Sequence, residues 1–263
     1  MKASAKNPFS DFGPGVRLSA DESETPRSKR APLPMNLFKE FKAFAPVGRD
    51  LPMDRILASH ESAIERLTEG YKLLLSDEAD GDAWKPDGDT IARLYVRSAE
   101  IVDTIRPNAT EIEAFCLYAM RSEDADFFLM GPLGLYLSAL CNASSSSDIT
   151  IDCQGEGLRL PLVGYRLEEG RCLTVLGDLG DLIGISLDGG TLKVGSVGRY
   201  LGAGMTSGSI EVRGDAGRFV GEQMTGGVIR IEGELGGMGK PVEGEVWNRV
   251  RRVYPVGSSG ERN

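Results

Sequence analysis

Histidine is almost absent from this sequence of 263 residues, and its cysteines are few and unpaired. His60 is the only histidine, and none of the four cysteines belongs to a C-x-x-C pair. General bases and zinc sites are built mainly from these two residue types. We therefore expect no metal ion, no cofactor and no catalytic residue, and we interpret the cysteines as free thiols in a reducing cytoplasm.

An excess of positive charge and long apolar runs are also missing. The net charge of −9 at pH 7 argues against general binding to nucleic acids or to anionic membranes. The N-terminal segment has no apolar run of the kind found in secretory signals. The longest apolar stretch, Phe127 to Cys141, is interrupted by Gly131, Pro132 and Gly134 and is too short to cross a bilayer. We expect a cytoplasmic protein with no membrane and no nucleic-acid partner.

Glycine, by contrast, is abundant and periodic, with 34 copies in the chain. Four glycines, at intervals of 18, 19 and 19 residues, each open a G-x-x-G motif, and another glycine follows each of the first three motifs. An alternating apolar pair, such as Ile210 and Val212, lies between successive motifs. The structural glycines of the repeat are Gly177, Gly180, Gly184, Gly195, Gly198, Gly202, Gly214, Gly217, Gly221, Gly233 and Gly236.

This repeat predicts a β-solenoid in which each unit forms one coil. Glycine in a helix interior costs roughly 0.5–1 kcal/mol relative to alanine, so the glycine spacing excludes helices. A unit of this length cannot bury its own apolar face and must stack on its neighbours. We expect Ile210 and Val212 to point inward, and Glu211 and Arg213 to face solvent. A weaker copy of the pattern begins at Ile149, so we expect about four to five coils.

The sequence pattern changes along the chain and divides it into four regions. Residues 1–35 are rich in Ser, Pro and charged residues and are predicted to be a disordered tail. Residues 36–146 show apolar residues at helical spacing and are predicted to form a helical domain. Residues 147–240 form the predicted β-helix, and residues 241–263 a C-terminal cap segment and tail. The predicted fold class is therefore α+β.

Two further expectations concern the ends of these elements. Thr110 and Glu113 have the spacing of a capping box, so we expect a helix to begin there. The end coils of a solenoid expose unpaired strand edges and need a cover. The stretch from Phe127 to Cys141 precedes the first coil and is predicted to cover that end. Residues 241–263 are predicted to close the other end.

The stretch GDAGRFVGEQMTGGVIRIEG, from Gly214 to Gly233, resembles the glycine-rich GXGXG domain. That domain forms one of the subunits of formylmethanofuran dehydrogenase and the C-terminal domain of the large chain of glutamate synthase. The resemblance covers the repeat region and implies a right-handed, single-stranded parallel β-helix. It also implies an architectural role in a larger oxidoreductase or amidotransferase-like assembly, because the domain offers no chemical group that maps onto this chain.

The leading hypothesis is a non-catalytic structural or docking subunit, whose partners are other protein subunits or further copies of this chain. One basic cluster stands in the C-terminal segment, where arginines alternate with aromatic residues. This is the composition of interface anchors, although a solvated edge strand is an alternative interpretation. The candidate partner-binding residues are Trp247, Arg249, Arg251, Arg252 and Tyr254.

Two other functions remain open at this point. The first is an enzyme with its site in the cleft between the helical domain and the first coils, using Cys153, Cys172, Tyr165 and Arg166. The second is a scaffold in which solenoids assemble end to end. Although Cys153 and Cys172 stand one coil length apart, Cys153 is predicted at a corner and Cys172 just before a strand. We therefore do not expect these two cysteines to stack.

Overall fold

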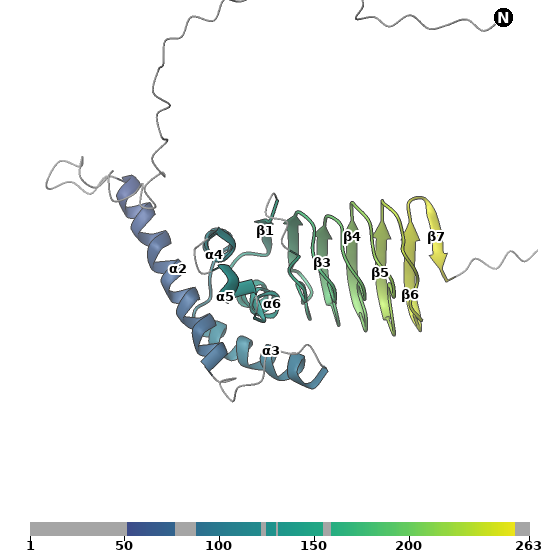
Figure 1. Cartoon of the computed structure of the whole chain (residues 1–263), viewed down its shortest axis with the longest axis horizontal. Helices are drawn as coiled ribbons and strands as arrows, with labels where there is room; N and C mark the ends of the chain where they lie inside the picture. Colours follow the sequence, from purple (N-terminus) through teal and green to yellow (C-terminus); the bar gives the residue numbers. More distant parts are fainter. Residues whose placement is uncertain (1–51, 77–87, 122–124, 130, 155–158, 256–263) are drawn as a thin grey trace, which may run out of the picture. The chain divides into compact units, whose positions relative to one another are not determined.

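The computed structural model of the chain describes residues 52–76, 88–121, 125–129, 131–154 and 159–255. Helices precede strands along the chain (Figure 1), which confirms the predicted α+β class. The predicted disordered tail, the beginning of the predicted helical domain and the end of the predicted C-terminal segment lie outside the described residues. No helix among the described residues is both long enough and apolar enough to cross a bilayer.

Five helices precede the sheet in the part of the chain that the structure describes. They are α2 (Pro52–Ser76), α3 (Gly88–Asp103), α4 (Ala109–Arg121), α5 (Ala125–Leu129) and α6 (Leu133–Ala143). Helix α3 forms because its apolar residues recur every three to four positions, which places them on one face. That face is buried, and α3 packs against α6. The buried residues of α3 are Ile91, Leu94, Tyr95, Ser98, Ile101 and Val102.

The start of α4 differs from the prediction by two residues. Asn108 Oδ1 accepts a hydrogen bond from the backbone N–H of Glu111 (3.0 Å), and Glu111 Oε2 accepts one from the backbone N–H of Asn108 (2.9 Å). This reciprocal pair is a capping box. The predicted cap at Thr110 and Glu113 is therefore wrong. The same three-residue spacing occurs two residues earlier, and the cap forms there.

Seven strands form one sheet in sequence order in the described residues, with β1 to β6 parallel and β7 antiparallel to β6. Each parallel strand is followed by a segment that returns to the start of the next, so the strands are one face of a β-solenoid of about four turns (Figure 1). This confirms the predicted solenoid. The strands are β1 (Asp148–Asp152), β2 (Cys172–Leu176), β3 (Asp188–Val194), β4 (Ser207–Val212), β5 (Thr225–Ile231), β6 (Glu243–Asn248) and β7 (Arg251–Tyr254).

Apolar side chains of successive strands stack inside the coils, as the alternation predicts. Ile210 of β4 pairs in register with Leu192 of β3 and Ile229 of β5, and all three are fully buried. Glu211, the next residue along β4, is half-exposed on the other face. The buried cluster is continuous from the helices into the coils, so the helices and the solenoid share one hydrophobic core.

The return half of each coil carries left-handed backbone at alternate positions. Gly202 has a φ of 61°, and its N–H donates to the carbonyl oxygen of Ile183 in the preceding coil (2.8 Å). Tyr200, two residues earlier, has a φ of 63° although it carries a large side chain, and its N–H donates to Arg218 O in the next coil (2.9 Å). Left-handed backbone costs a non-glycine residue roughly 1–2 kcal/mol. Bonding to both neighbouring coils offsets this cost. The equivalent non-glycine residues are Leu162, Leu182, Tyr200 and Phe219.

Helix α6 covers the first coil and takes the place of a preceding coil. In the second coil, the N–H of Gly184 donates to the carbonyl oxygen of Val163 (2.9 Å). The equivalent N–H in the first coil, that of Gly164, donates to Ser138 Oγ of α6 (2.9 Å). The N–H of Tyr165 donates to the same oxygen (3.1 Å). The hydroxyl of Ser138 therefore supplies the acceptor that a backbone carbonyl supplies elsewhere.

Asn142, one turn further along α6, does the same at a second position. In the second coil the N–H of Asp188 donates to Leu167 O (3.0 Å), whereas the equivalent N–H of Glu168 donates to Asn142 Oδ1 (3.2 Å). The amide of Asn142 also donates to Arg166 O (2.8 Å). This helix overlaps the stretch that the sequence predicts as the cover of the first coil. Its polar side chains satisfy the end of the backbone ladder.

Gly134 of α6 faces the first coil so closely that a Cβ atom there would clash with the carbonyl oxygen of Pro161. Gly134→Ala should therefore lower the stability by about 1–3 kcal/mol, although alanine is the better helix former. Gly88→Ala is the matched control, because a Cβ at this glycine of α3 meets no atom within 4 Å. The melting temperatures of both variants test this. An equal shift in the two variants would contradict the close packing of α6 on the first coil.

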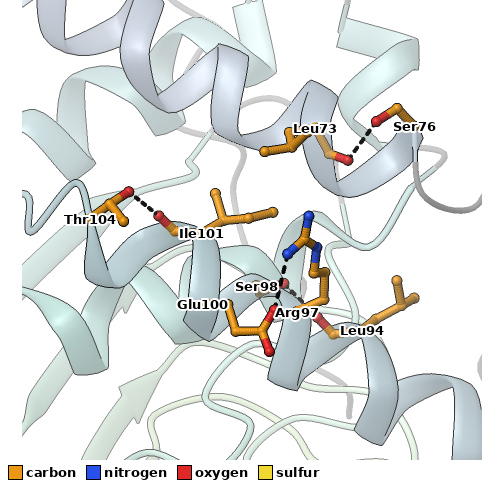
Figure 2. A network of polar contacts seen from close by, with 8 residues as sticks. All are labelled: Leu73, Ser76, Leu94, Arg97, Ser98, Glu100, Ile101 and Thr104. Atoms are coloured by element: carbon orange, nitrogen blue, oxygen red, sulfur yellow. Dashed lines mark hydrogen bonds and ion pairs between the residues drawn. The ribbon is translucent and has the colours of Figure 1, made fainter.

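Ser138→Ala should cost about 1–3 kcal/mol of unfolding free energy, because two buried backbone N–H groups lose their acceptor. Ser98→Ala is the control: Ser98 is also fully buried, but its hydroxyl only donates to Leu94 O within the same helix (Figure 2). Urea titration should show the smaller loss for Ser98→Ala. Hydrogen exchange should show faster exchange at Gly164 and Tyr165 in Ser138→Ala alone. Unchanged exchange at both amides would refute the proposed capping of the ladder.

Candidate docking surface

The basic cluster that the sequence singles out lies on the last hairpin of the sheet. Strand β6 ends at Asn248 and β7 begins at Arg251, with which Asn248 pairs, so Arg249 and Val250 form a two-residue loop. Arg249 has a φ of 56°, as the first loop residue of a type II′ turn does. Val250 at the loop tip is 95% exposed. We call Trp247, Arg249, Arg251, Arg252 and Tyr254 the terminal hairpin surface.

Trp247 and Arg252 lie opposite each other on this surface and share one carboxylate. They are partners in the antiparallel register of β6 and β7. The Trp247 Nε1–H donates to Glu245 Oε2 (2.8 Å), and the Arg252 guanidinium lies 3.7 Å from Glu245 Oε1. The guanidinium also lies 6.0 Å from the centre of the Trp247 ring, a cation–π distance. These contacts hold an aromatic ring and a cation against the outer face of the sheet.

The other arginines differ in how far they are neutralised. Arg249 Nε donates to the backbone carbonyl of Glu232 at a long 3.4 Å. Arg251 is exposed, and its side chain makes no hydrogen bond or ion pair with any described residue. Sequence reasoning missed Glu245, which neutralises part of the charge of Arg252. Its place one residue before the buried Val246 could have indicated an outward side chain beside Trp247.

Tyr254 contributes to packing rather than to the exposed part of the surface. Its side chain packs against the core cluster, and its hydroxyl donates to Val242 O (2.8 Å). This contact fixes the end of β7 on the last coil. The structure thus brings Trp247 and Arg252 into contact and leaves Arg249 and Arg251 at the tip.

The fold does not bring together the two cysteines of the alternative enzyme site, Cys153 and Cys172. In the register of β1 and β2, Asp148 pairs with Cys172 and Asp152 pairs with Leu176. Cys153 follows Asp152, so the two cysteines lie at opposite ends of the strand pair, about 16 Å apart along it. They do not stack, as expected. Cys172 is the first residue of β2, however, not a residue before the strand, because its pairing with Asp148 extends the ladder.

Tyr165 and Arg166 belong to a packed contact between the first coil and the helices. The ring of Tyr165 lies edge-on against Tyr95 of α3, with ring centres 4.9 Å apart, and the Arg166 guanidinium lies 5.5 Å from the Tyr165 ring. Tyr95 in turn accepts a hydrogen bond from the amide of Asn142 (2.7 Å). These contacts join α3 and α6 to the first coil.

Burial keeps three of the thiols protonated at neutral pH. Burial, with a smaller contribution from Asp152, raises the pKa of Cys153 to about 11. Burial also raises the pKa of Cys141 to about 12 and that of Cys116 well above its usual range. A thiol is a weak nucleophile compared with its thiolate. These cysteines therefore behave as small apolar core residues.

A groove between α2 and α3 has a volume of about 520 Å³, and its polar lining residues are Arg66, Glu69, Arg97, Glu100 and Thr104. The contacts drawn in Figure 2 each stay within one helix: Arg97 pairs with Glu100 (3.0 Å), and Thr104 donates to Ile101 O. Leu73 at the groove is 48% exposed. Among the described residues, no group of three His, Cys, Asp or Glu side chains could hold a metal ion. His60 lies half-buried on α2.

Comparison with known proteins gives no relative for this chain: no family model, no curated protein and no solved structure matches it. The chain's own geometry therefore carries the functional proposal.

The three buried thiols should resist modification in the folded protein. In Cys172→Ser, which removes the most exposed cysteine, we expect no fast reaction with a disulfide reagent at pH 7.5, and reaction of all three thiols in denaturant. The protonated Cys153 stabilises the fold below the ordinary thiol pKa of about 8.5, and this stability should be lost as the pH rises to about 11. Rapid modification of folded Cys172→Ser at pH 7.5 would reopen the enzyme hypothesis.

Proposed function

We propose that this chain is a non-catalytic structural subunit that docks a protein partner through the terminal hairpin surface. The observation that carries the proposal is the arrangement at the hairpin: a tryptophan held by Glu245, an arginine against its ring, and the exposed Arg251 beside them. Tryptophan and arginine dominate the energetics of protein interfaces. An exposed cation with no partner favours a protein surface that carries carboxylates.

The position of the hairpin in the sheet supports docking at this end. Strand β7 is the last strand in the order of the sheet, so its outer edge pairs with no further strand in the described residues. Unpaired N–H and C=O groups of an edge strand are ready to pair with a partner strand. The solenoid behind the hairpin is bonded coil to coil, which makes it a stiff support for the surface.

The nature of the assembly is proposed from the resemblance to the GXGXG domain. We propose a cytoplasmic oxidoreductase or amidotransferase-like assembly, in which this β-helix supplies architecture while another chain supplies the chemistry. The protonated state of the buried thiols is consistent with this division. End-to-end assembly of copies of this chain would use the same edge of β7, so a test must distinguish a different chain from a further copy.

Charge reversal at the hairpin tests the proposal. We expect the tagged protein, purified from its host at low salt, to recover a partner chain in stoichiometric amount, and Arg249→Glu/Arg251→Glu/Arg252→Glu to lose at least nine-tenths of it. Three like charges placed opposite carboxylates repel where the arginines attract. Mass spectrometry identifies the partner, and light scattering at several concentrations reports self-association.

The matched control is Lys72→Glu/Arg93→Glu/Arg106→Glu, which makes the same change of charge at exposed positions of the helical region. This control should keep the partner. If both triple variants lose it, the interaction reflects overall charge and the docking surface is wrong. If the unaltered protein is recovered alone, or only as copies of itself, the proposed role in a larger assembly is refuted.

A further inference from the structure

A hollow on the outer face of β2 and β3 is unrelated to the hairpin. It has a volume of about 500 Å³, which is within the range of pockets that hold small molecules. Its walls come from the first coils of the solenoid, at the end of the strands where the chain leaves β2 and β3. We call it the outer hollow, and its polar lining residues are Arg159, Thr174, Asp178, Lys193 and Arg213, together with the amide of Gln154.

Gly195 lines the hollow with its backbone alone. The register of β2, β3 and β4 places Gly195 between Leu176 of the preceding coil and Arg213 of the following coil. A Cβ at Gly195 would clash with the carbonyl oxygen of Gly177, so close stacking of the coils requires glycine here. The flanking side chains of Leu176 and Arg213 therefore border an open space.

Cations from three different coils line this space. Arg159 precedes β2, Lys193 lies on β3, and Arg213 follows β4. The side chains of Arg159 and Arg213 make no hydrogen bond or ion pair within the described part of the chain. Lys193 lies 3.9 Å from Glu211, the outer limit of an ion pair. The hollow thus presents three cations, of which two have no fixed partner.

One carboxylate also lines the hollow, but it is already engaged. Asp178 Oδ1 accepts a hydrogen bond from the backbone N–H of Ser196 in the next coil (2.8 Å). Three cations therefore line the hollow beside one engaged carboxylate, while Glu211 lies near Lys193 and the charge of Arg159 also acts on Asp181. The hydroxyl of Thr174 stands beside Lys193, its partner in the register of β2 and β3, and adds a neutral donor.

We infer that the outer hollow binds a small organic phosphate. A phosphate monoester carries a charge close to −2 at neutral pH, which is opposite in sign to the two arginines and the lysine that line the hollow. Guanidinium groups bind phosphate oxygens through paired hydrogen bonds, and a lysine adds a compact positive charge. Leu176 is the apolar lining residue whose side chain lies on the outer face, and it would contact the organic part of the ligand, whereas Val175 and Val194 are buried on the inner face.

The test uses phenyl phosphate and inorganic phosphate as probes, with benzoate and phenol as comparators, in a phosphate-free buffer. Amide NMR spectra of the full chain should show saturable shifts at Gly177 and Gly195 with phenyl phosphate, with tighter binding than for inorganic phosphate, benzoate or phenol. Arg213→Gln and Arg159→Gln should each weaken binding at least tenfold, since each removes a charged donor. Thr174→Val, which keeps the charge, should weaken it less.

Arg230→Gln is the matched control, because Arg230 is an exposed arginine on the outer face of β5 and does not line the hollow. It should leave the affinity for phenyl phosphate within twofold. Absence of saturable shifts, or an equal loss of affinity in Arg230→Gln and Arg213→Gln, would overturn the site. Equal affinity for benzoate and phenyl phosphate would overturn the assignment to phosphate. Far-UV circular dichroism of each variant verifies that the coils remain folded.

Discussion

Backbone hydrogen bonds between successive coils are the interaction on which the rest of this structure depends. They join the strands, and they also join the return segments, where Tyr200 donates to the following coil and Gly202 to the preceding one. This pattern requires left-handed backbone at alternate positions of the return segments. It also requires the backbones of neighbouring coils to lie within hydrogen-bond distance. Glycine is therefore needed at positions such as Gly195, where a side chain would separate two coils. The regular spacing of the glycines in the sequence follows from this repeated bonding between coils.

The first and last coils each lack one neighbouring coil, and their free backbone hydrogen-bonding groups are satisfied in different ways. At the first coil, Ser138 and Asn142 on one face of α6 offer side-chain oxygens in place of the carbonyls of a preceding coil. At the last coil, β7 reverses direction and pairs with β6. At the first coil, side chains bond the backbone N–H groups that have no preceding coil. At the last coil, β7 bonds the free edge of β6 but leaves its own outer edge unpaired. The hairpin end is therefore the better candidate for a docking surface.

The sequence predicted the coils well because glycine spacing and apolar alternation are local signals. It could not predict the left-handed backbone of Tyr200 and Phe219, because nothing in those residue types favours it; the neighbouring coils impose it. The cap of α4 was misplaced because two equally spaced pairs compete. At the hairpin, the sequence indicated Trp247 beside arginines, but the contact of both with Glu245 depends on the register of β6 and β7.

The stiffness of the ladder also bears on how the two proposed sites relate. The outer hollow extends from β2 to Arg213, which follows β4, and the hairpin lies at β6 and β7, so two coil spacings of about 4.8 Å each, roughly 10 Å, separate β4 from β6. Sites this far apart with no shared partners are energetically independent unless the structure between them has two arrangements. Coils bonded along both halves and filled by a continuous core offer one arrangement. A ligand in the hollow would therefore reside beside the docked partner without altering its affinity, and the solenoid would act as a spacer between the two.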